Sequence, residues 1–286
     1  MRDFYIDILQ DLLSKGALDL NMRILVLCGG PRDRAALLSC GIRAATISNV
    51  DPRMTGNEYA PFEWKFQDAE HVSFENDSFD FCIAADGLHH CQSPHRALLE
   101  MYRVARLGII VLEPRDNLTT RIGVRLGFGQ DYETAAVHDN AAKFGGVRNT
   151  EIPNFVYRWT EREIEKTVQA YAPWGKHQFI YWYKLRLPWL QLRTRRSKAK
   201  LLLTMAAYPF LRLLTWIFPG QSNNFAFAIL KPRVPQDLLP WVTLDGRNMK
   251  VNRAWLDRRY GPSIAGHTES AVADSSAANR TLPSGS

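Results

Sequence analysis

Hydrophobic residues in the first 114 positions form short continuous runs, and segments with helical spacing lie between them. The runs are Met22–Cys28, Ala44–Asn49, Phe79–Ala85 and Leu107–Leu112. Runs of this length that end in glycine or polar residues are typical of strands buried on both faces of a sheet. Helices are predicted over 32–38 and 94–105 from their apolar spacing and from Pro31 at the first turn of the former. Strands that alternate with helices predict an α/β fold, with a mostly parallel sheet covered by helices on both faces.

The pattern of hydrophobic residues differs before the first predicted strand and after residue 114. Phe4, Ile8 and Leu12 have helical spacing and predict an amphipathic helix before the first strand, not a signal peptide. Residues 115–158 are weakly periodic and rich in Gly and Asn, which indicates an insert acting as a lid over a substrate. A helix is predicted over 159–172 with Thr160 as N-cap and Glu163 completing a capping box. Two aromatic-rich strands are expected at His177–Tyr183 and Asn224–Leu230.

Composition narrows the class of protein. The 286 residues are 46% hydrophobic and 23% charged, which is ordinary for a globular chain and excludes collagen-like or wholly disordered proteins. The cysteines, Cys28, Cys40, Cys82 and Cys91, form no CxxC pair, so we expect free thiols and a cytoplasmic location. Lys and Arg exceed Asp and Glu by 36 to 29, a net charge of +7 that suggests an anionic partner.

Candidate binding residues stand where the predicted strands end. The pair Gly29 and Gly30 follows the first strand and allows a close approach of the backbone to a ligand at a helix N-terminus. Asn49 comes 19 residues after Gly30 and Asp51 two residues further, where such folds bind a ribose. Asp68 and Ala69 follow after a similar interval and are placed to meet an adenine edge. This ordered spacing predicts a nucleoside-type cofactor.

The segment Phe66–Pro114 resembles the middle of class I S-adenosylmethionine-dependent methyltransferases of the type 11 group. The resemblance rests on Asp68-Ala69-Glu70, Asn76-Asp77-Ser78-Phe79-Asp80, Leu88-His89-His90, Arg103-Val104 and Glu113-Pro114, in this order. It implies a Rossmann-like, seven-stranded and mostly parallel sheet whose last strand, Asn224–Leu230, runs antiparallel. It also implies S-adenosyl-L-methionine as the cofactor, bound by Cys28, Gly29, Gly30, Asn49, Asp51, Asp68, Ala69 and Ala85. Methyltransferases of polysaccharide and lipid-linked sugar pathways are similar, so O-methylation of a small or lipid-linked, sugar-type acceptor is expected.

The first motif departs from this family. Val26 stands at the position where the family has an acidic residue, and Cys28, Gly30 and Arg32 stand at its three glycine positions. Asn49 stands where the family has a ribose-binding carboxylate. An alternative is therefore a non-catalytic protein that keeps the fold and acts as a membrane-associated or interaction module. A nicotinamide-dependent oxidoreductase is disfavoured because GxGxxG is not present.

A hydroxyl acceptor needs a general base or strong polarisation. The candidate catalytic residues at the sheet edge are His89, His90 and Glu113, with Asp131 and His138 of the insert and Asp86 as further candidates. Histidine suits a base because its pKa lies near neutral pH. The competing interpretation is that the two histidines only orient the ends of a helix and a strand. No metal site is expected, because adjacent side chains do not easily converge on one ion.

The inserts are expected to select the acceptor. The insert 115–158 contains basic and aromatic residues that suit a phosphorylated or sugar acceptor: Arg121, Arg125, Tyr132, Lys143, Phe144, Arg148, Phe155 and Tyr157. The alternative is that the insert is an ordinary solvated lid. Seven basic residues lie between Lys184 and Lys200, and the apolar run Leu201–Phe218 follows. This combination predicts peripheral contact of 184–218 with the inner face of a membrane, or else a helix packed on the protein. Nucleic acid is not an expected partner, and the oligomeric state stays open.

These observations divide the chain into segments. The N-terminal helix and the cofactor-binding half of the domain are expected in 1–114, the lid insert in 115–158, and the second half of the domain in 159–232 with a basic and apolar insert at 184–221. A C-terminal extension is expected in 233–260, and 261–286 is predicted to be a disordered tail because it is rich in Ser, Ala and Gly.

Overall fold

The computed structural model describes residues 3–187, 189, 198–246 and 248–261. The chain forms two compact units. The first comprises Met1–Pro173 and His177–Lys231, and the second comprises Trp174–Lys176 and Pro232–Ser286. The predicted tail at 261–286, apart from Gly261, and Arg193, Arg195 and Arg196 of the basic run lie outside the described residues.

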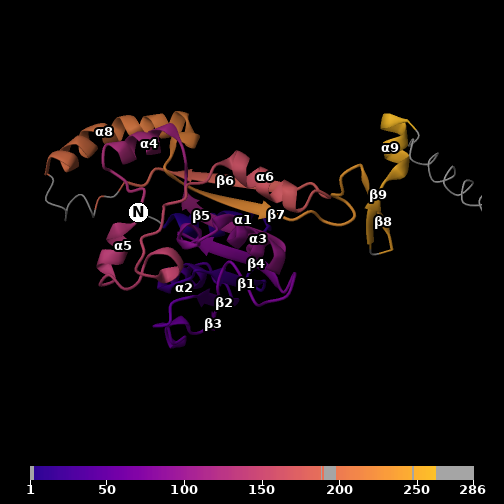
Figure 1. Ribbon diagram of the computed structural model, residues 1–286, viewed down its shortest axis with the longest axis horizontal. Coiled ribbons are helices and arrows are strands. Elements are labelled where there is room, and N and C mark those ends of the chain that lie inside the picture. Colours follow the sequence, from indigo (N-terminus) through magenta and orange to yellow (C-terminus); the bar gives the residue numbers. More distant parts are fainter. Residues whose placement is uncertain (1–2, 188, 190–197, 247, 262–286) are drawn as a thin grey trace, which may run out of the picture. The chain divides into compact units, whose positions relative to one another are not determined.

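A seven-stranded sheet in the order β3-β2-β1-β4-β5-β7-β6 forms the centre of the first unit (Figure 1). The strands are β1 (Arg23–Leu27), β2 (Ala44–Asn49), β3 (Glu63–Phe66), β4 (Phe79–Ala85), β5 (Ala105–Pro114), β6 (Gln178–Lys184) and β7 (Asn224–Leu230). β7 is antiparallel to both of its neighbours, β5 and β6, and the other described pairings in this sheet are parallel. The predicted Rossmann-like fold and its antiparallel last strand are confirmed.

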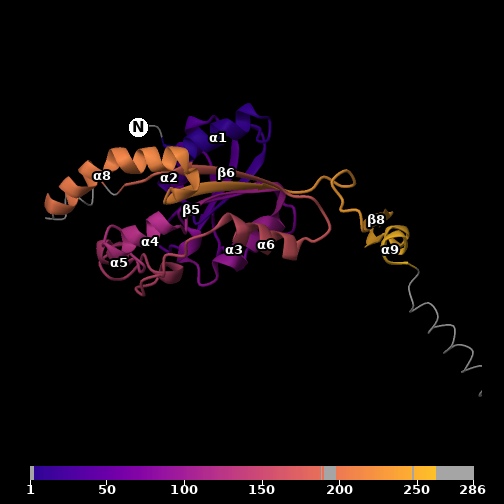
Figure 2. The ribbon, with the colours of Figure 1, turned by 90° about the horizontal axis from the view of Figure 1, so that it is seen from above.

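Helices cover both faces of this sheet (Figure 2). One face carries α1 (Phe4–Ser14) and α2 (Pro31–Ser39), and the other carries α3 (Pro94–Val104) and α6 (Glu161–Tyr171). Side chains of α1 such as Ile8 and Leu12 are fully buried in a core with β1, β4 and β5. Asp3, Ser93 and Thr160 cap α1, α3 and α6 by accepting hydrogen bonds from backbone N–H groups of the first turn, which fixes where these helices begin.

The structure differs from the sequence prediction at several elements. β3 was not predicted, because an edge strand with exposed charged residues lacks a continuous apolar run. Thr160 is the predicted N-cap of α6, but the Glu163 carboxylate contacts His95 and Tyr157 instead of closing a capping box. The insert is partly helical, with α4 (Leu118–Arg125) and α5 (Thr134–Asp139). Short 3₁₀ turns are η1 (Asn57–Tyr59), η2 (Leu88–His90), η3 (Val147–Asn149) and η4 (Pro219–Gln221).

The apolar run of the second insert forms one long helix, α8 (Lys198–Ile217). It is the one helix among the described residues whose length and composition would allow it to cross a membrane, and little of it is buried. Pro209 lies inside the helix.

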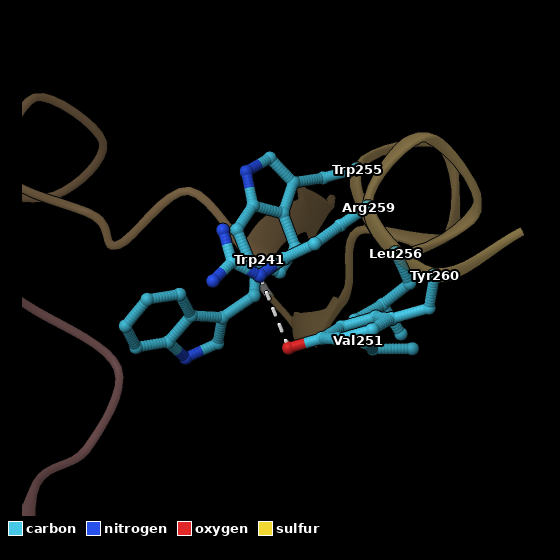
Figure 3. Close-up of a pocket in the computed structure, with 6 residues that line it drawn as sticks. All are labelled: Trp241, Val251, Trp255, Leu256, Arg259 and Tyr260. Atoms are coloured by element: carbon cyan, nitrogen blue, oxygen red, sulfur yellow. Dashed lines mark hydrogen bonds between the residues drawn. The ribbon is translucent and has the colours of Figure 1, made fainter.

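The second unit contains a hairpin of β8 (Val242–Asp245) and β9 (Asn248–Val251), followed by α9 (Arg253–Tyr260). Aromatic side chains from these elements surround a cavity of about 410 Å³ (Figure 3). The Arg259 guanidinium lies over the rings of Trp255 and Tyr260, and its Nε donates to the Tyr260 hydroxyl at 3.1 Å. None of the predicted site residues lines this cavity.

Candidate functional site

The predicted binding residues gather at one edge of the sheet. β1, β2, β4 and β5 are parallel, so their carboxyl ends meet there, and the strand order reverses between β1 and β4. Ligands of open α/β sheets bind at such a reversal. The residues that end or follow these strands include Cys28, Gly29, Gly30, Asn49, Asp51, Ala85, His89, His90 and Glu113, while Asp68 and Ala69 follow β3.

The two glycines after β1 serve different purposes. A Cβ atom at Gly29 would lie 2.7 Å from Ile47 Cγ2 and 2.9 Å from Val26 Cγ1, so packing requires glycine there. A Cβ at Gly30 would meet no atom within 4 Å, and its backbone is extended, with φ −147° and ψ −171°. Gly30 therefore borders open space at the N-terminus of α2, where a ligand can approach.

Alanine substitutions should separate these two purposes. We expect Gly30→Ala to leave the free energy of unfolding within about 0.5 kcal/mol of the parent, because its methyl group meets no protein atom. The same methyl group should weaken S-adenosylhomocysteine binding by about 1–3 kcal/mol if the cofactor fills this space. Gly29→Ala is the matched control and should lower stability by about 1–3 kcal/mol through overpacking. Calorimetric titration and urea unfolding measure both effects, and a Gly30→Ala variant with unchanged affinity would place the cofactor elsewhere.

The first glycine position of the motif keeps a left-handed backbone conformation although it holds a cysteine. Cys28 has φ 53°, in the left-handed region that favours glycine. Its side chain packs against Gly87, where an added Cβ would lie 2.4 Å from Cys28 Cβ. The third glycine place holds Arg32, whose guanidinium binds Asp86 at 2.6 Å and Asp3 at 3.0 Å. The larger side chains therefore join β1 and α2 to the neighbouring end of β4.

The expected ribose-binding residues contact their own loop. Asn49 Nδ2 donates to the Gly29 carbonyl at 2.8 Å, and Asn49 Oδ1 accepts from the Asp51 amide at 3.1 Å. Asp51 is buried and pairs with Arg53 at 2.5 Å. Hydrogen bonding by the Arg53 guanidinium holds the pKa of the Asp51 carboxyl below its usual value. A ribose at this place would have to share these side chains with the loop.

The insert lies against the far part of this edge. Arg148 Nη2 donates to Asp68 Oδ2 at 2.6 Å, and Asp68 Oδ1 accepts from the Glu70 amide at 2.9 Å. The Arg53 guanidinium lies 4.2 Å from the centre of the Phe144 ring. The structure thus brings residues of 115–158 onto the predicted adenine and ribose positions.

A buried carboxyl that the sequence did not single out lies at the start of α2. Asp33 accepts from the Gly30 amide at 2.8 Å through Oδ2 and is 5% exposed. Burial raises the pKa of Asp33 to about 6, although the hydrogen bond from Gly30 partly opposes this. The sequence signal available was an acid at the third position of a helix after Gly-Gly-Pro.

This raised pKa should make stability depend on pH. Between about pH 4 and 6 the folded state binds more protons at Asp33 than the unfolded state, so the free energy of unfolding falls as the pH rises. Over about two pKa units this amounts to about 3 kcal/mol. Asp33→Asn keeps an acceptor for Gly30 and should stabilise the protein by up to that amount at pH 7.5, with little effect at pH 4.

Urea unfolding at both pH values measures this difference. The control is Asp139→Asn at an exposed carboxylate of α5, which should change stability little at either pH. A destabilised Asp33→Asn protein at pH 7.5 would show that the charge at this position is favourable.

Glu113 organises the other end of the site. It is fully buried and accepts hydrogen bonds from the amides of Gly87 and Leu88 at 3.0 and 2.7 Å. His89 Nδ1 donates to the second carboxylate oxygen at 2.6 Å. Burial opposes the charged imidazolium, but Glu113 and Glu133 outweigh it and hold the pKa of His89 well above its usual range. Glu113 and His89 therefore fix the turn η2, and neither faces open solvent.

His90 is the more accessible histidine, with 30% of its side chain exposed. Its Nε2 lies 3.2 Å from Glu133 Oε2, and its ring centre lies 4.6 Å from that of His89. Burial together with the charge on His89 lowers the pKa of His90. Burial alone would raise the pKa of Glu133, but the two histidines outweigh it and lower that pKa to about 2.

The sequence did not predict the residues of the insert that reach this cluster. Glu133 precedes α5, and Asn154 Nδ2 donates to the His89 carbonyl at 3.1 Å and to Glu133 Oε2 at 3.3 Å. The expected insert residues lie in other contacts, since Asp131 pairs with Arg158 and the exposed His138 pairs with Asp139. Asp86, the further candidate after β4, pairs with Arg32 and Arg186. No sequence signal separated Glu133 from its acidic neighbours.

Comparisons with known proteins give one family match and several similar structures. Residues 28–112, which are 85 of the 286, match the family model described as "Methyltransferase domain". A comparison with curated proteins finds no match. Solved structures that are similar include the YcgJ protein from Bacillus subtilis, which is 16% identical with a TM-score of 0.48, covering 79% of this chain and 99% of that one.

Two further similar structures come from other organisms. An S-adenosylmethionine-dependent methyltransferase from Thermotoga maritima, described as a possible histamine N-methyltransferase, is 16% identical with a TM-score of 0.43, covering 79% of this chain and 89% of that one. Phosphoethanolamine N-methyltransferase 2 from Haemonchus contortus, solved with S-adenosyl-L-methionine, is 15% identical with a TM-score of 0.44, covering 79% of this chain and 53% of that one.

The sheet order and the family match define a methyltransferase domain with a Rossmann-like fold. The matched region gives the chain a methyltransferase domain of the S-adenosylmethionine-dependent class, whose cofactor is S-adenosyl-L-methionine. The alternative of a non-catalytic protein with this fold is not favoured by these findings.

Proposed function

We propose that the protein methylates an oxygen of a small or lipid-linked, sugar-type acceptor at the inner surface of a membrane. The single observation that carries this proposal is α8, a long apolar helix that lies exposed beside basic residues at the site's end of the sheet. The contacts of the lid insert support the choice of acceptor.

The residues at the sheet edge suit the cofactor in part. Gly30 borders open space, Asp68 carries a carboxylate for an adenine amino group, and Cys28 keeps the backbone conformation of the missing glycine. The ribose position fits less well, because Asn49 and Asp51 already have partners. When bound, S-adenosylmethionine supplies a methyl group activated by its sulfonium, so the protein mainly has to align an acceptor and exclude water.

An exposed aromatic pair of the insert is a suitable platform for a sugar. Tyr132 and Phe155 form an isolated antiparallel bridge within the insert, next in sequence to Glu133 and Asn154. The two rings meet edge to face with centres 5.5 Å apart, and each is more than half exposed. Exposed aromatic rings offer a rigid apolar surface at low entropic cost, which suits stacking against a pyranose face.

The exposed surface of α8 suits a membrane. Large apolar side chains are exposed along the whole helix: Leu202, Leu203, Met205, Phe210, Leu213, Trp216 and Ile217. Leu118 and Ile122 of α4 and Leu126 directly after it are also exposed, and Lys200 of α8 donates to the Gly127 carbonyl. The sequence from Leu185 to Gln236 contains no acidic residue. An apolar face with only basic charges around it favours an interface rich in anionic lipids.

The connections of α8 favour a helix lying on a membrane over one crossing it. Lys184 at the end of β6 is paired with Asn224 at the start of β7, so the chain leaves the sheet and returns to it at the same point. A single crossing would place these paired strands on opposite sides of the membrane. Peripheral contact through 184–218 on the cytoplasmic side satisfies both the pairing and the exposed apolar face.

Vesicle flotation tests the membrane part of the proposal. The full chain is expected to float with phosphatidylcholine vesicles that contain phosphatidylglycerol, and much less with phosphatidylcholine alone. Leu213→Glu/Trp216→Glu should reduce binding at least tenfold, because two charges would enter the apolar interface. Leu38→Glu/Phe66→Glu, at exposed apolar positions outside α8, is the matched control and should bind normally. Equal binding by all three proteins would contradict a role for α8.

Methyl transfer tests the acceptor class. The protein is incubated with methyl-labelled S-adenosylmethionine and either a chloroform–methanol extract or an aqueous extract of the source membranes. Label in an acid-stable, ether-linked form in the chloroform–methanol fraction is the expected result. Label only in nitrogen-containing or water-soluble products would contradict the lipid-linked hydroxyl acceptor.

A further inference from the structure

His89, His90 and Glu133 bring three metal-binding atoms to one point of the site. One ring nitrogen of each histidine and one carboxylate oxygen of Glu133 all lie within 4.8 Å of one another. Glu133 Oε2 is 3.2 Å from His90 Nε2 and 3.5 Å from His89 Nε2. Metal–ligand bonds of about 2.0–2.2 Å in a tetrahedral zinc site place neighbouring ligand atoms about 3.3–3.6 Å apart.

We propose that His89, His90 and Glu133 form a binding site for a divalent transition-metal ion such as Zn²⁺. Two imidazole nitrogens and one carboxylate are a recurrent ligand set of zinc sites that keep an open coordination position. Sequence reasoning disfavoured a metal because adjacent histidines rarely converge. The 3₁₀ turn η2 overcomes this, since it brings both rings to the same carboxylate of the insert.

The neighbouring residues orient these ligands as in known metal sites. Glu113 binds Nδ1 of His89, which leaves Nε2 directed at Glu133. A carboxylate on the second nitrogen of a ligating histidine fixes its tautomer and orientation. Asn154 donates to both Glu133 and the His89 carbonyl and so joins the insert to η2. The ligands are thus held from two segments of the chain by contacts that do not use the ligating atoms of the histidines.

The open position of such a site faces a part of the protein that solvent can reach. His90 and Glu133 are each 30% exposed. A bound ion there could polarise an acceptor hydroxyl; this use rests on the proposed function, whereas metal binding itself does not.

Zinc titration of the full chain tests the site without cofactor or acceptor. The protein is prepared without a histidine tag, stripped with a chelator and titrated with ZnCl₂ by calorimetry, and Co²⁺ absorption reports the coordination. We expect one saturable ion per chain. His90→Ala and Glu133→Gln should each weaken Zn²⁺ binding at least tenfold and abolish the intense tetrahedral Co²⁺ bands.

His138→Ala is the matched control, because it removes an exposed histidine of the same insert that also pairs with a carboxylate. It should leave Zn²⁺ affinity unchanged. Thermal unfolding confirms that each variant is folded, and Glu133→Gln serves if His90→Ala is not. Absence of saturable binding at micromolar Zn²⁺, or equal affinity in the parent, His90→Ala and Glu133→Gln, would overturn the site. Either result leaves S-adenosylhomocysteine binding as a separate test of the proposed function.

Discussion

Glu113→Ala is expected to lower the free energy of unfolding by about 3–5 kcal/mol, the largest loss that the site predicts. The reason is that this fully buried carboxylate is the partner of three groups, the amides of Gly87 and Leu88 and the imidazole of His89. Removing it leaves Nδ1 of the buried His89 and two backbone amides without a partner. Urea unfolding at neutral pH measures the loss.

Two further variants show whether this loss of stability comes from the buried hydrogen bonds of Glu113. Glu113→Gln keeps an oxygen that accepts from the two amides, and its NH₂ group can donate to Nδ1 of a neutral His89, so its expected loss is only about 1–2 kcal/mol. Glu63→Ala, at an exposed carboxylate of β3, should change stability by less than about 0.5 kcal/mol. A loss below about 1 kcal/mol for Glu113→Ala would mean that the turn η2 does not depend on this carboxylate.

Asp68→Ala is expected to weaken S-adenosylhomocysteine binding by about 1–3 kcal/mol, which is about 5- to 150-fold in Kd. The proposed role of Asp68 is to accept a hydrogen bond from the adenine amino group at the end of β3. Asp68→Asn retains an oxygen acceptor for the Glu70 amide and should weaken binding less. Calorimetric titration of the three proteins gives the comparison.

Arg148→Ala separates this role from a purely structural one. Arg148 is an ion-pair partner of Asp68 in the structure. If Asp68 mattered only as the anchor of the insert, Arg148→Ala would weaken binding as much as Asp68→Ala does. We expect Arg148→Ala to bind at least as well as the parent, because it frees the Asp68 carboxylate. Affinity within twofold of the parent for Asp68→Ala would contradict the adenine role.

The central strands and the helices beside them were predictable because their burial requires a pattern of apolar residues that can be recognised in a short stretch of sequence. Parallel strands covered on both faces are continuous apolar runs, as in Ile24–Leu27 and Ile109–Leu112, and both runs are fully or almost fully buried. β3 escaped prediction because it lies at the sheet edge and its side chains are exposed or half-buried. Its apolar and charged residues carry no pattern that separates them from a loop.

The site was predictable only where residues sit at strand ends. Gly30, Asp68, His89 and Glu113 follow from the order of the motifs and the geometry of a parallel sheet. Glu133 and Asn154 did not follow, because they come from a weakly periodic insert whose path depends on tertiary contacts. The hydrogen-bond and ion-pair partners of a side chain likewise depend on tertiary contacts and cannot be predicted from the sequence.

Calorimetric titration of the full chain with S-adenosylhomocysteine shows whether this protein holds the cofactor of a methyltransferase. The protein has the sheet and the methyltransferase-domain match, yet two glycine positions of its first motif hold Cys28 and Arg32, and the ribose position at the end of β2 holds Asn49. We expect saturable binding of one ligand per chain, weakened by Gly30→Ala and Asp68→Ala and retained in Asp139→Asn. Absence of binding at millimolar ligand would contradict the account, because a chain that does not hold the cofactor cannot transfer its methyl group.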